Sequence, residues 1–178
     1  CALCLFLSAC ASQQPEDGSS TEPPNTVRIT IPEGASAADI GGLMEQNGLF
    51  TRSEFLAEVN RGNADSPLVQ EIGDWENRAF LLEGYLFPDT YEFYRDDSPE
   101  RVIQKLLDNL EKKITGTQKA RAKEFDMTMD EVLTLASIIQ AEAGDPAQMK
   151  TVSSVLHNRL NSKSHPKLEC DVTIFYLE

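Results

Sequence analysis

Cysteine and histidine are scarce in most of this chain. Three of the four cysteines lie within the first ten residues, so only Cys170 remains in the body of the sequence. A single cysteine excludes a disulfide within that body. The two histidines, His157 and His165, add few ligands, and no close pair of ligands has the spacing of a zinc site. We therefore expect no metal ion and no cofactor.

Positive charge is scarce as well. The chain has 16 Lys and Arg against 29 Asp and Glu, which gives a net charge of -13. Because no basic stripe is left to neutralise phosphates, we do not expect nucleic acid as a partner. The 40% hydrophobic content over 178 residues is ordinary for a globular protein. It leaves room for one medium domain, or for a small module plus a core-bearing domain.

A long apolar run is missing too. The most apolar stretch, CALCLFLSAC at residues 1–10, is shorter than the roughly 20 residues that a membrane-spanning helix needs. A short apolar run that ends in small residues is typical of an export signal. Within it, LSAC resembles a bacterial lipobox, which predicts lipidation of Cys10. An ordinary signal peptide and a clipped membrane anchor remain as alternatives.

All three interpretations put the body of the chain outside the cytoplasm. A lipid on Cys10 would hold it at the extracytoplasmic face of the cell membrane. Residues 11–26, ASQQPEDGSSTEPPNT, contain no large apolar side chain and are rich in Pro, Ser and acidic residues. That composition is typical of a flexible linker between the membrane and a folded part.

Order is expected to begin at residues 27–31, VRITI, an alternating strand. Two short helices should follow, because Ser36 and Thr51 each precede an acidic residue by three positions, which is the spacing of a capping box. Together these elements predict a compact module over residues 27–78.

A second, mixed part is expected over residues 79–178, which makes the fold class α+β. The stretch 79–94 favours a strand, a loop and a second strand. Three helices should follow. They start at Ser98-Pro99, at Thr128 with Glu131, and near residue 147, and a short strand over 172–176 should end the chain.

One acidic residue interrupts the apolar face of the predicted helix LASIIQAEAG. That face is marked by Val132, Leu135, Ile138 and Ile139. Glu142 points the same way, because it follows Ile138 by four positions and Ile139 by three. A carboxyl half-buried among Leu and Ile side chains keeps its proton more readily than one in water, which suits a general acid. The alternative is a glutamate at a helix end that turns to solvent.

Other candidate residues are weaker. Glu83, within the aromatic stretch LLEGYLF, either lines a site or partners a buried backbone amide or an arginine. Cys170 with His157 or His165 would suit a thiol hydrolase. However, no helix N-terminus that would favour a thiolate is evident before Cys170. We expect His157 to be a surface or packing residue and His165 to be solvated.

Five stretches, in order, resemble the endolytic murein transglycosylases, the YceG-like family: IPEGASAADIGGLMEQNGLF, LLEGYLFPDTYEF, LASIIQAEAG, VSSVLHNRL and LECDVTIFY. They cover nearly everything from Val27 onward. The resemblance implies a LysM-like module over 27–78, followed by a catalytic domain over 79–178 that cuts peptidoglycan glycan strands. It also implies an association with the cell-wall synthesis machinery. The family's catalytic glutamate ends an A-S-[IL]-[IV]-x-x-E motif, which is Glu142 in this sequence.

The implied reaction needs one carboxylate where most glycoside hydrolases use two. Glu142 would protonate the oxygen that links N-acetylmuramic acid to N-acetylglucosamine. It would then take the proton from the muramic C6 hydroxyl, which closes onto C1 to give a 1,6-anhydro sugar. Because the nucleophile is tethered to the reacting ring, the site must orient that ring and exclude water. Cleavage within nascent strands would limit their length.

The resemblance places four further residues around the sugar or in the shell that holds Glu142: Asn158, Arg159, Asp171 and Thr173. The first two could instead brace the adjoining loop. The sequence departs from the family at three positions, Glu169, Cys170 and Val172, where Gln, a small hydroxyl residue and Pro are more frequent. Glu169 would add a second negative charge if it lines the groove.

Family members continue past the last aromatic motif, so the resemblance implies that this catalytic domain is incomplete at its C-terminus. An alternative function is therefore a non-catalytic factor for peptidoglycan binding or wall assembly. In that case the LysM-like module grips glycan and the second domain is inert.

Overall fold

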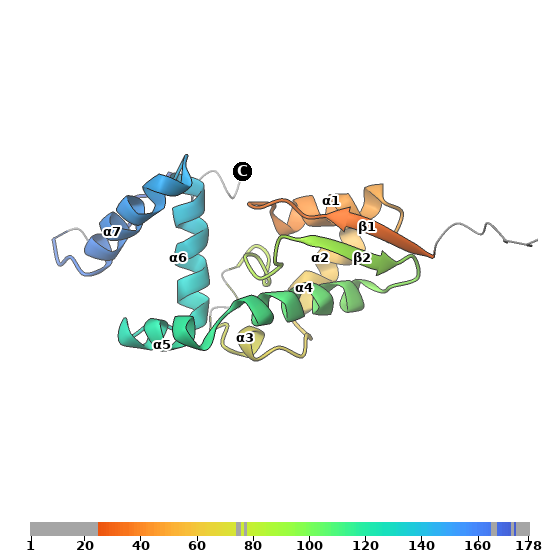
Figure 1. Cartoon of the computed structure of the whole chain (residues 1–178), viewed down its shortest axis with the longest axis horizontal. Coiled ribbons are helices and arrows are strands. Elements are labelled where there is room, and N and C mark those ends of the chain that lie inside the picture. The colour runs from red at the N-terminus through yellow and green to blue at the C-terminus, as the bar shows by residue number, and fades with distance from the viewer. Residues whose placement is uncertain (1–24, 74–75, 77, 165–166, 172, 174–178) are drawn as a thin grey trace, which may run out of the picture.

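The computed structural model describes residues 25–73, 76, 78–164, 167–171 and 173. In this part of the chain the elements form an elongated molecule with two lobes (Figure 1). The first lobe contains the elements β1 to α4, and the second contains α5, α6, η1 and α7.

Two antiparallel strands form the sheet of the first lobe: β1 (Thr26–Thr30) and β2 (Thr90–Tyr94). The strand expected at 27–31 is confirmed, shifted by one residue. Alternation along β2 buries Tyr91 and Phe93, whose rings stack with 5.7 Å between their centroids. Ile29 lies opposite Tyr91, so the apolar side chains of both strands face the same side.

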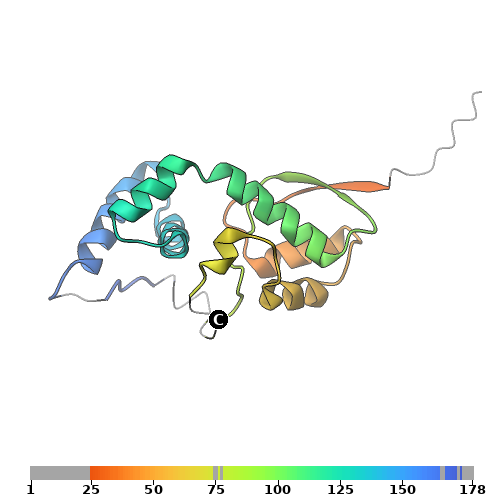
Figure 2. The same cartoon turned by 90° about the horizontal axis from the view of Figure 1, so that it is seen from below.

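Two helices cover that side of the strand pair (Figure 2): α1 (Ala37–Gln46) and α2 (Arg52–Arg61). Both expected capping boxes are present. Ser36 and Thr51 accept hydrogen bonds from the amides of Asp39 and Glu54, and these two carboxylates accept from the cap amides. Each box therefore satisfies two amides at a helix start that the helix itself leaves unpaired.

The longest helix of the first lobe, α4 (Pro99–Lys113), runs beside β2 and packs against α2 (Figure 1). It begins at Ser98 with Pro99 in the first turn, as expected. Its apolar stripe is buried: Val102, Ile103, Leu106, Leu107 and Leu110. Together with the sheet, α1, α2 and the short α3 (Pro67–Gln70), this stripe forms the main core of the molecule.

The main core crosses the expected module boundary. β1 lies before residue 78 and its partner β2 lies after residue 79, and buried side chains from both sides share one cluster. The division into residues 27–78 and 79–178, and the LysM-like character of the first part, stay predictions.

The second lobe is helical: α5 (Gly116–Glu124), α6 (Met129–Glu142), the 3-10 turn η1 (Pro146–Gln148) and α7 (Met149–Leu160). α7 packs against α6. Leu135 of α6 and Leu156 of α7 form a small second core together with Cys170. The first turns of α6 belong instead to the main core, through Met129. Thus α6 connects the two cores.

Several expectations were wrong in detail. Residues 79–89 form turns, with Gly84 at φ +82°, and only 90–94 is a strand. Helix α5 was not predicted, since Ala122 is its one buried residue and it has no apolar stripe. On α7, Val155 and Leu160 recur at helical spacing with Val152 and Leu156, but they are 44% and 54% exposed. The strand expected at 172–176 lies outside the described residues, apart from residue 173.

No helix in the described residues is both long and apolar enough to cross a bilayer. Residues 1–24, with the expected lipidation site at Cys10 and the expected linker, are not among them.

Candidate active site

Helix α6 determines where Glu142 lies. Thr128 and Glu131 form the expected capping box at its start, with hydrogen bonds of 2.8 and 3.1 Å between each backbone amide and the partner side chain. Glu142 is the last residue of the helix. Its side chain is exposed, so the expectation of a half-buried carboxyl was wrong. The second core reaches only as far as Ile138 and Ile139, which are half-buried themselves, and the final turn of α6 extends past it.

Cys170 lies close to this helix end. It is buried with Leu135 and Leu156 in the second core. Burial raises the pKa of its thiol, because the thiolate is poorly solvated there; the charge of Glu142 raises that pKa further. Arg159 lowers the pKa and Asp171 raises it. Coulombic effects weaken with distance, so the charges of Glu142, Arg159 and Asp171 lie near enough to act on this thiol.

This environment disfavours a nucleophilic thiol. Two carboxylates and burial keep Cys170 protonated, whereas a reactive cysteine needs neighbours that stabilise the thiolate. The His157 ring stacks on Phe125, with 5.3 Å between centroids, at the junction of α5 and α7. His165 lies outside the described residues.

An open hollow of about 290 Å³ lies beside α7, lined by Val155, Asn158, Arg159, Ser162 and Glu169. Three of the expected sugar-contacting residues therefore share one concave surface. The Arg159 guanidinium donates a hydrogen bond to the carbonyl of Leu168, which ties α7 to the following segment. Arg159 is thus both a brace, as the alternative held, and part of the hollow.

The segment after the hollow has an unusual backbone. Glu169 adopts φ +53°, in the left-handed region that residues with a side chain rarely occupy. The hydroxyl of Thr173 donates to the Cys170 carbonyl at 2.7 Å, which closes a turn around Asp171. Asp171 itself is exposed. This turn holds Cys170 inward and Asp171 outward.

Glu83 lies in the first lobe. Its carboxylate accepts hydrogen bonds from the amide of Ala37, at 3.2 and 3.0 Å to its two oxygens. Ala37 is the first residue of α1, so the Glu83 carboxylate accepts from a backbone amide that the helix itself leaves unpaired. Negative charge is also favourable at a helix start. The structure thus shows the backbone-partner alternative for Glu83, and its role in sugar binding stays a prediction.

The sequence did not reveal a charged cluster at the other end of α6. Asp130 is only 8% exposed, and both of its oxygens accept hydrogen bonds from Arg78, at 2.7 and 2.6 Å. The Tyr85 hydroxyl also donates to Asp130, at 2.6 Å. In the sequence, Asp130 has the position of an ordinary acidic residue in the first turn of a helix, and Arg78 is 52 positions away. No local pattern signals such a pair.

Among the residues that the structure describes, no group of three His, Cys, Asp or Glu side chains could hold a metal ion. The polar side chains that line the hollow include a carboxylate, an arginine and an amide, those of Glu169, Arg159 and Asn158.

Comparison with known proteins gives a consistent result. The model of the YceG-like family matches residues 13–178. An endolytic murein transglycosylase of Bacillus subtilis is 29% identical over 156 residues, which is 84% of this chain and 43% of that protein. One from Streptococcus pneumoniae is 30% identical over 178 residues, 92% of this chain and 32% of that protein. The chain thus spans less than half the length of these relatives.

A solved structure shares the fold. The crystal structure of a YceG-like protein from Listeria monocytogenes superposes with a TM-score of 0.68 at 23% identity, and covers 84% of this chain and 50% of the other. The family model matches nearly the whole sequence, and the described elements agree with a solved member. The chain belongs to the YceG-like family.

Proposed function

We propose that this protein is an endolytic lytic transglycosylase. It cleaves the bond between N-acetylmuramic acid and N-acetylglucosamine in nascent peptidoglycan strands and leaves 1,6-anhydromuramyl ends. Family membership and the names of the relatives support murein as the substrate class. The structural observation that carries the proposal is the position of Glu142, exposed at the end of α6, a helix that packs against α7, which lines the hollow.

Glu142 is the proposed acid and base. An exposed carboxylate is accessible to a glycan strand but also to water, so closure of the site over the sugar must supply the exclusion of water. The proton passes from Glu142 to the glycosidic oxygen, whose bond to muramic C1 breaks. The muramic C6 hydroxyl then bonds to C1 and returns its proton to Glu142. Atoms and charge balance without a second carboxylate.

The hollow is the proposed sugar contact. Asn158 and Glu169 offer an amide and a carboxylate to hydroxyl and acetamido groups, and Val155 offers an apolar contact to a ring face. Asp171 and Thr173 adjoin it through the turn at Cys170. In this proposal Glu83 serves the site indirectly, since it fixes the start of α1.

The test compares Glu142→Gln with Glu45→Gln, which neutralises an exposed glutamate on α1, in the other lobe. Each purified protein is incubated with uncrosslinked peptidoglycan, and 1,6-anhydromuramyl ends are counted by mass spectrometry. Loss of the general acid and base should lower product formation by at least about 100-fold in Glu142→Gln. Glu45→Gln should match the wild type.

Two outcomes would count against the proposal. Equal product from wild type and Glu142→Gln would remove Glu142 from the mechanism. Binding to sacculi without any anhydro ends would instead support the non-catalytic wall-assembly factor.

We also propose that a lipid on Cys10 holds the protein at the extracytoplasmic face of the cell membrane, near the wall-synthesis machinery. This rests on the lipobox-like LSAC alone. A Cys10→Ser chain that stays in the membrane fraction would contradict it.

A further inference from the structure

The cluster of Arg78, Asp130 and Tyr85 lies where α6 leaves the first lobe. Arg78 and Tyr85 belong to the first lobe, and Asp130 is the second residue of α6. Tyr85 is 1% exposed, and burial raises the pKa of its hydroxyl above the ordinary value, with the hydrogen bond to Asp130 adding to the shift. The phenol therefore stays protonated and donates to a carboxylate that Arg78 already pairs.

The cluster is more specific than apolar packing. Met129 and its neighbours on α6 also contact the main core, but apolar contacts tolerate small rotations. Two charge-assisted hydrogen bonds and one short phenol bond converge on a single carboxylate and fix its direction. A buried carboxylate that lost these donors would be strongly destabilised, so the cluster has one favourable arrangement.

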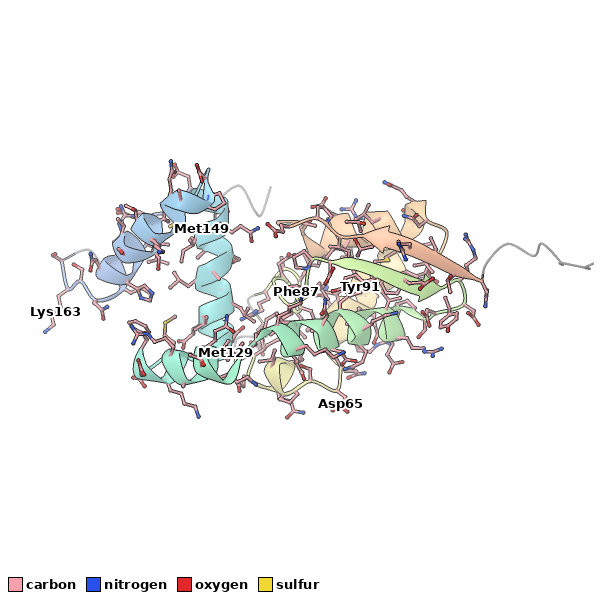
Figure 3. The ribbon with its side chains drawn as sticks, in the orientation of Figure 1. Asp65, Phe87, Tyr91, Met129, Met149 and Lys163 are labelled. Atoms are coloured by element: carbon pink, nitrogen blue, oxygen red, sulfur yellow. The ribbon has the colours of Figure 1, made fainter. Side chains whose placement is uncertain are left out.

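The helix transmits this direction to Glu142. Glu142 follows Asp130 by 12 positions (142 minus 130), which is roughly 18 Å along a helix at 1.5 Å per residue. A tilt of about 3° at the start of α6 therefore moves Glu142 by about 1 Å. Figure 3 labels Met129 at the N-terminal end of α6 and Met149 where α7 begins, close to its other end.

The far end of α6 has a much weaker tie to the first lobe. The Gln140 amide lies near Gly34, at 3.7 Å from where a Cβ of that glycine would be. Gln140 is exposed and uncharged, so this approach constrains the helix less than the buried ion pair does.

We propose that Arg78, Asp130 and Tyr85 are positioning residues that set the direction of α6, and with it Glu142, relative to the first lobe, where the expected LysM-like module would hold part of the same glycan. The effect of this positioning on catalysis rests on the proposed function. A misplacement of 1 Å at a reacting group can cost a factor of about 100 in rate. A tilt of α6 by a few degrees is therefore enough to lower the rate.

The chain offers a matched pair of tyrosines for the test. Tyr91 is also buried, and its hydroxyl donates to the Phe87 carbonyl at 2.7 Å and accepts from Asn109 at 2.9 Å. Tyr85→Phe and Tyr91→Phe each remove one buried hydroxyl from the first lobe, but only the first touches α6. Both should lower the Tm by a similar amount, about 2–4 °C.

The kinetic prediction separates positioning from stability. With uncrosslinked peptidoglycan, kcat of Tyr85→Phe should fall about tenfold while KM stays unchanged. The binding surfaces remain intact, and only the Glu142 carboxylate is displaced from the reacting bond. Tyr91→Phe should keep the wild-type kcat. Asp130→Asn, which removes the charge paired with Arg78, should lower kcat further. Equal kcat in the two tyrosine variants would overturn the inference even if Asp130→Asn fails to fold.

A second readout needs no activity. Spin labels are attached to cysteines introduced at two exposed positions, Glu45 on α1 and Ala141 on α6, in a full chain whose own four cysteines are replaced by serine. The labels report the distance between the two lobes. The distance distribution should broaden in Tyr85→Phe and not in Tyr91→Phe. Unchanged distributions in both would reject the positioning role. An inactive wild type with a broadened Tyr85→Phe distribution would reject the proposed function and leave the aiming of α6 supported.

Discussion

At the scale of single residues, Cys170 reports on its surroundings. Its thiol is buried at the edge of the second core, and the charges of Glu142, Arg159 and Asp171 all act on it. Burial is the largest cause of its raised pKa, and Glu142 is the next. The reactivity of this thiol can therefore measure whether the proposed general acid lies where α6 places it.

Alkylation of Cys170 should respond to Glu142. At pH 8 the thiol should react slowly with iodoacetamide in the folded chain, because the thiolate is scarce. Glu142→Gln removes a negative charge that raises the pKa, so the thiolate fraction and the alkylation rate should increase. Peptide mass spectrometry distinguishes Cys170 from the three N-terminal cysteines. Glu45→Gln, at an exposed position on α1 in the other lobe, serves as the control, and an identical alkylation rate in both variants would show that the charge of Glu142 does not act on Cys170.

The sequence predicted the position of Glu142 on α6 but not its exposure. Helical spacing fixes which face a residue takes, whereas exposure depends on what covers that face, and the second core ends before the last turn. Asp130 shows the same limit from the opposite side. It is buried because Arg78 and Tyr85, distant in sequence, surround its carboxylate.

At the scale of elements, local signals explain most of what could be predicted. Helices α1, α2, α4 and α6 all start at a hydroxyl residue with the expected cap, because capping chemistry lies within four residues. Helix α5 has such a cap as well, at Thr115 with Gln118, but lacks an apolar stripe and was missed. The strand expected before Gly84 failed because the chain there turns with positive φ and has no strand partner in the described residues.

The capping box of α1 should make stability depend on pH. The Ser36 side chain is the main cause of the lowered pKa of Asp39, below its ordinary 3.8. A carboxylate with a lowered native pKa stabilises the fold above its unfolded pKa, and this contribution is lost as the pH falls through the native pKa. Ser36→Ala should cost about 1 kcal/mol at pH 7 and less near pH 2.

Urea unfolding at both pH values measures this difference. Ser154→Ala is the control, since the Ser154 hydroxyl donates to the Lys150 carbonyl and has no carboxylate partner within the described residues. A Ser36→Ala deficit that is as large at pH 2 as at pH 7 would show that Asp39 does not share in the cap.

At the scale of the whole molecule, the two lobes differ in how much they bury. The main core gathers side chains from the sheet, α1 to α4 and the first turns of α6, whereas the second core has three buried residues. Local opening requires less free energy where fewer apolar contacts are lost. The lobe that carries the proposed site is therefore the less stable part of the described chain, as is usual for functional regions.

Amide hydrogen exchange should resolve this difference. The amides of α7 should exchange faster than those of α2 and α4, because the buried side chain of α7, Leu156, lies in the small core. Leu156→Ala should speed exchange in α7 and leave α4 protected. Leu106→Ala, in the main core, should lower the global free energy of unfolding by about 2–5 kcal/mol and speed exchange in both. Equal protection of α7 and α4 in the wild type would contradict the unequal cores.

The pairing of β1 with β2 also affects when the first lobe can fold during synthesis. Thr30 and Thr90 lie side by side at 2.8 Å between their hydroxyl oxygens, although they are 60 positions apart. During synthesis at about 5–20 residues per second, β1 waits roughly 3–12 s before β2 exists to pair with it. Strand β1 thus finds its partner only when most of the first lobe has been made. We therefore expect folding of the main core to be late and non-local, and the closing of that long loop to slow it.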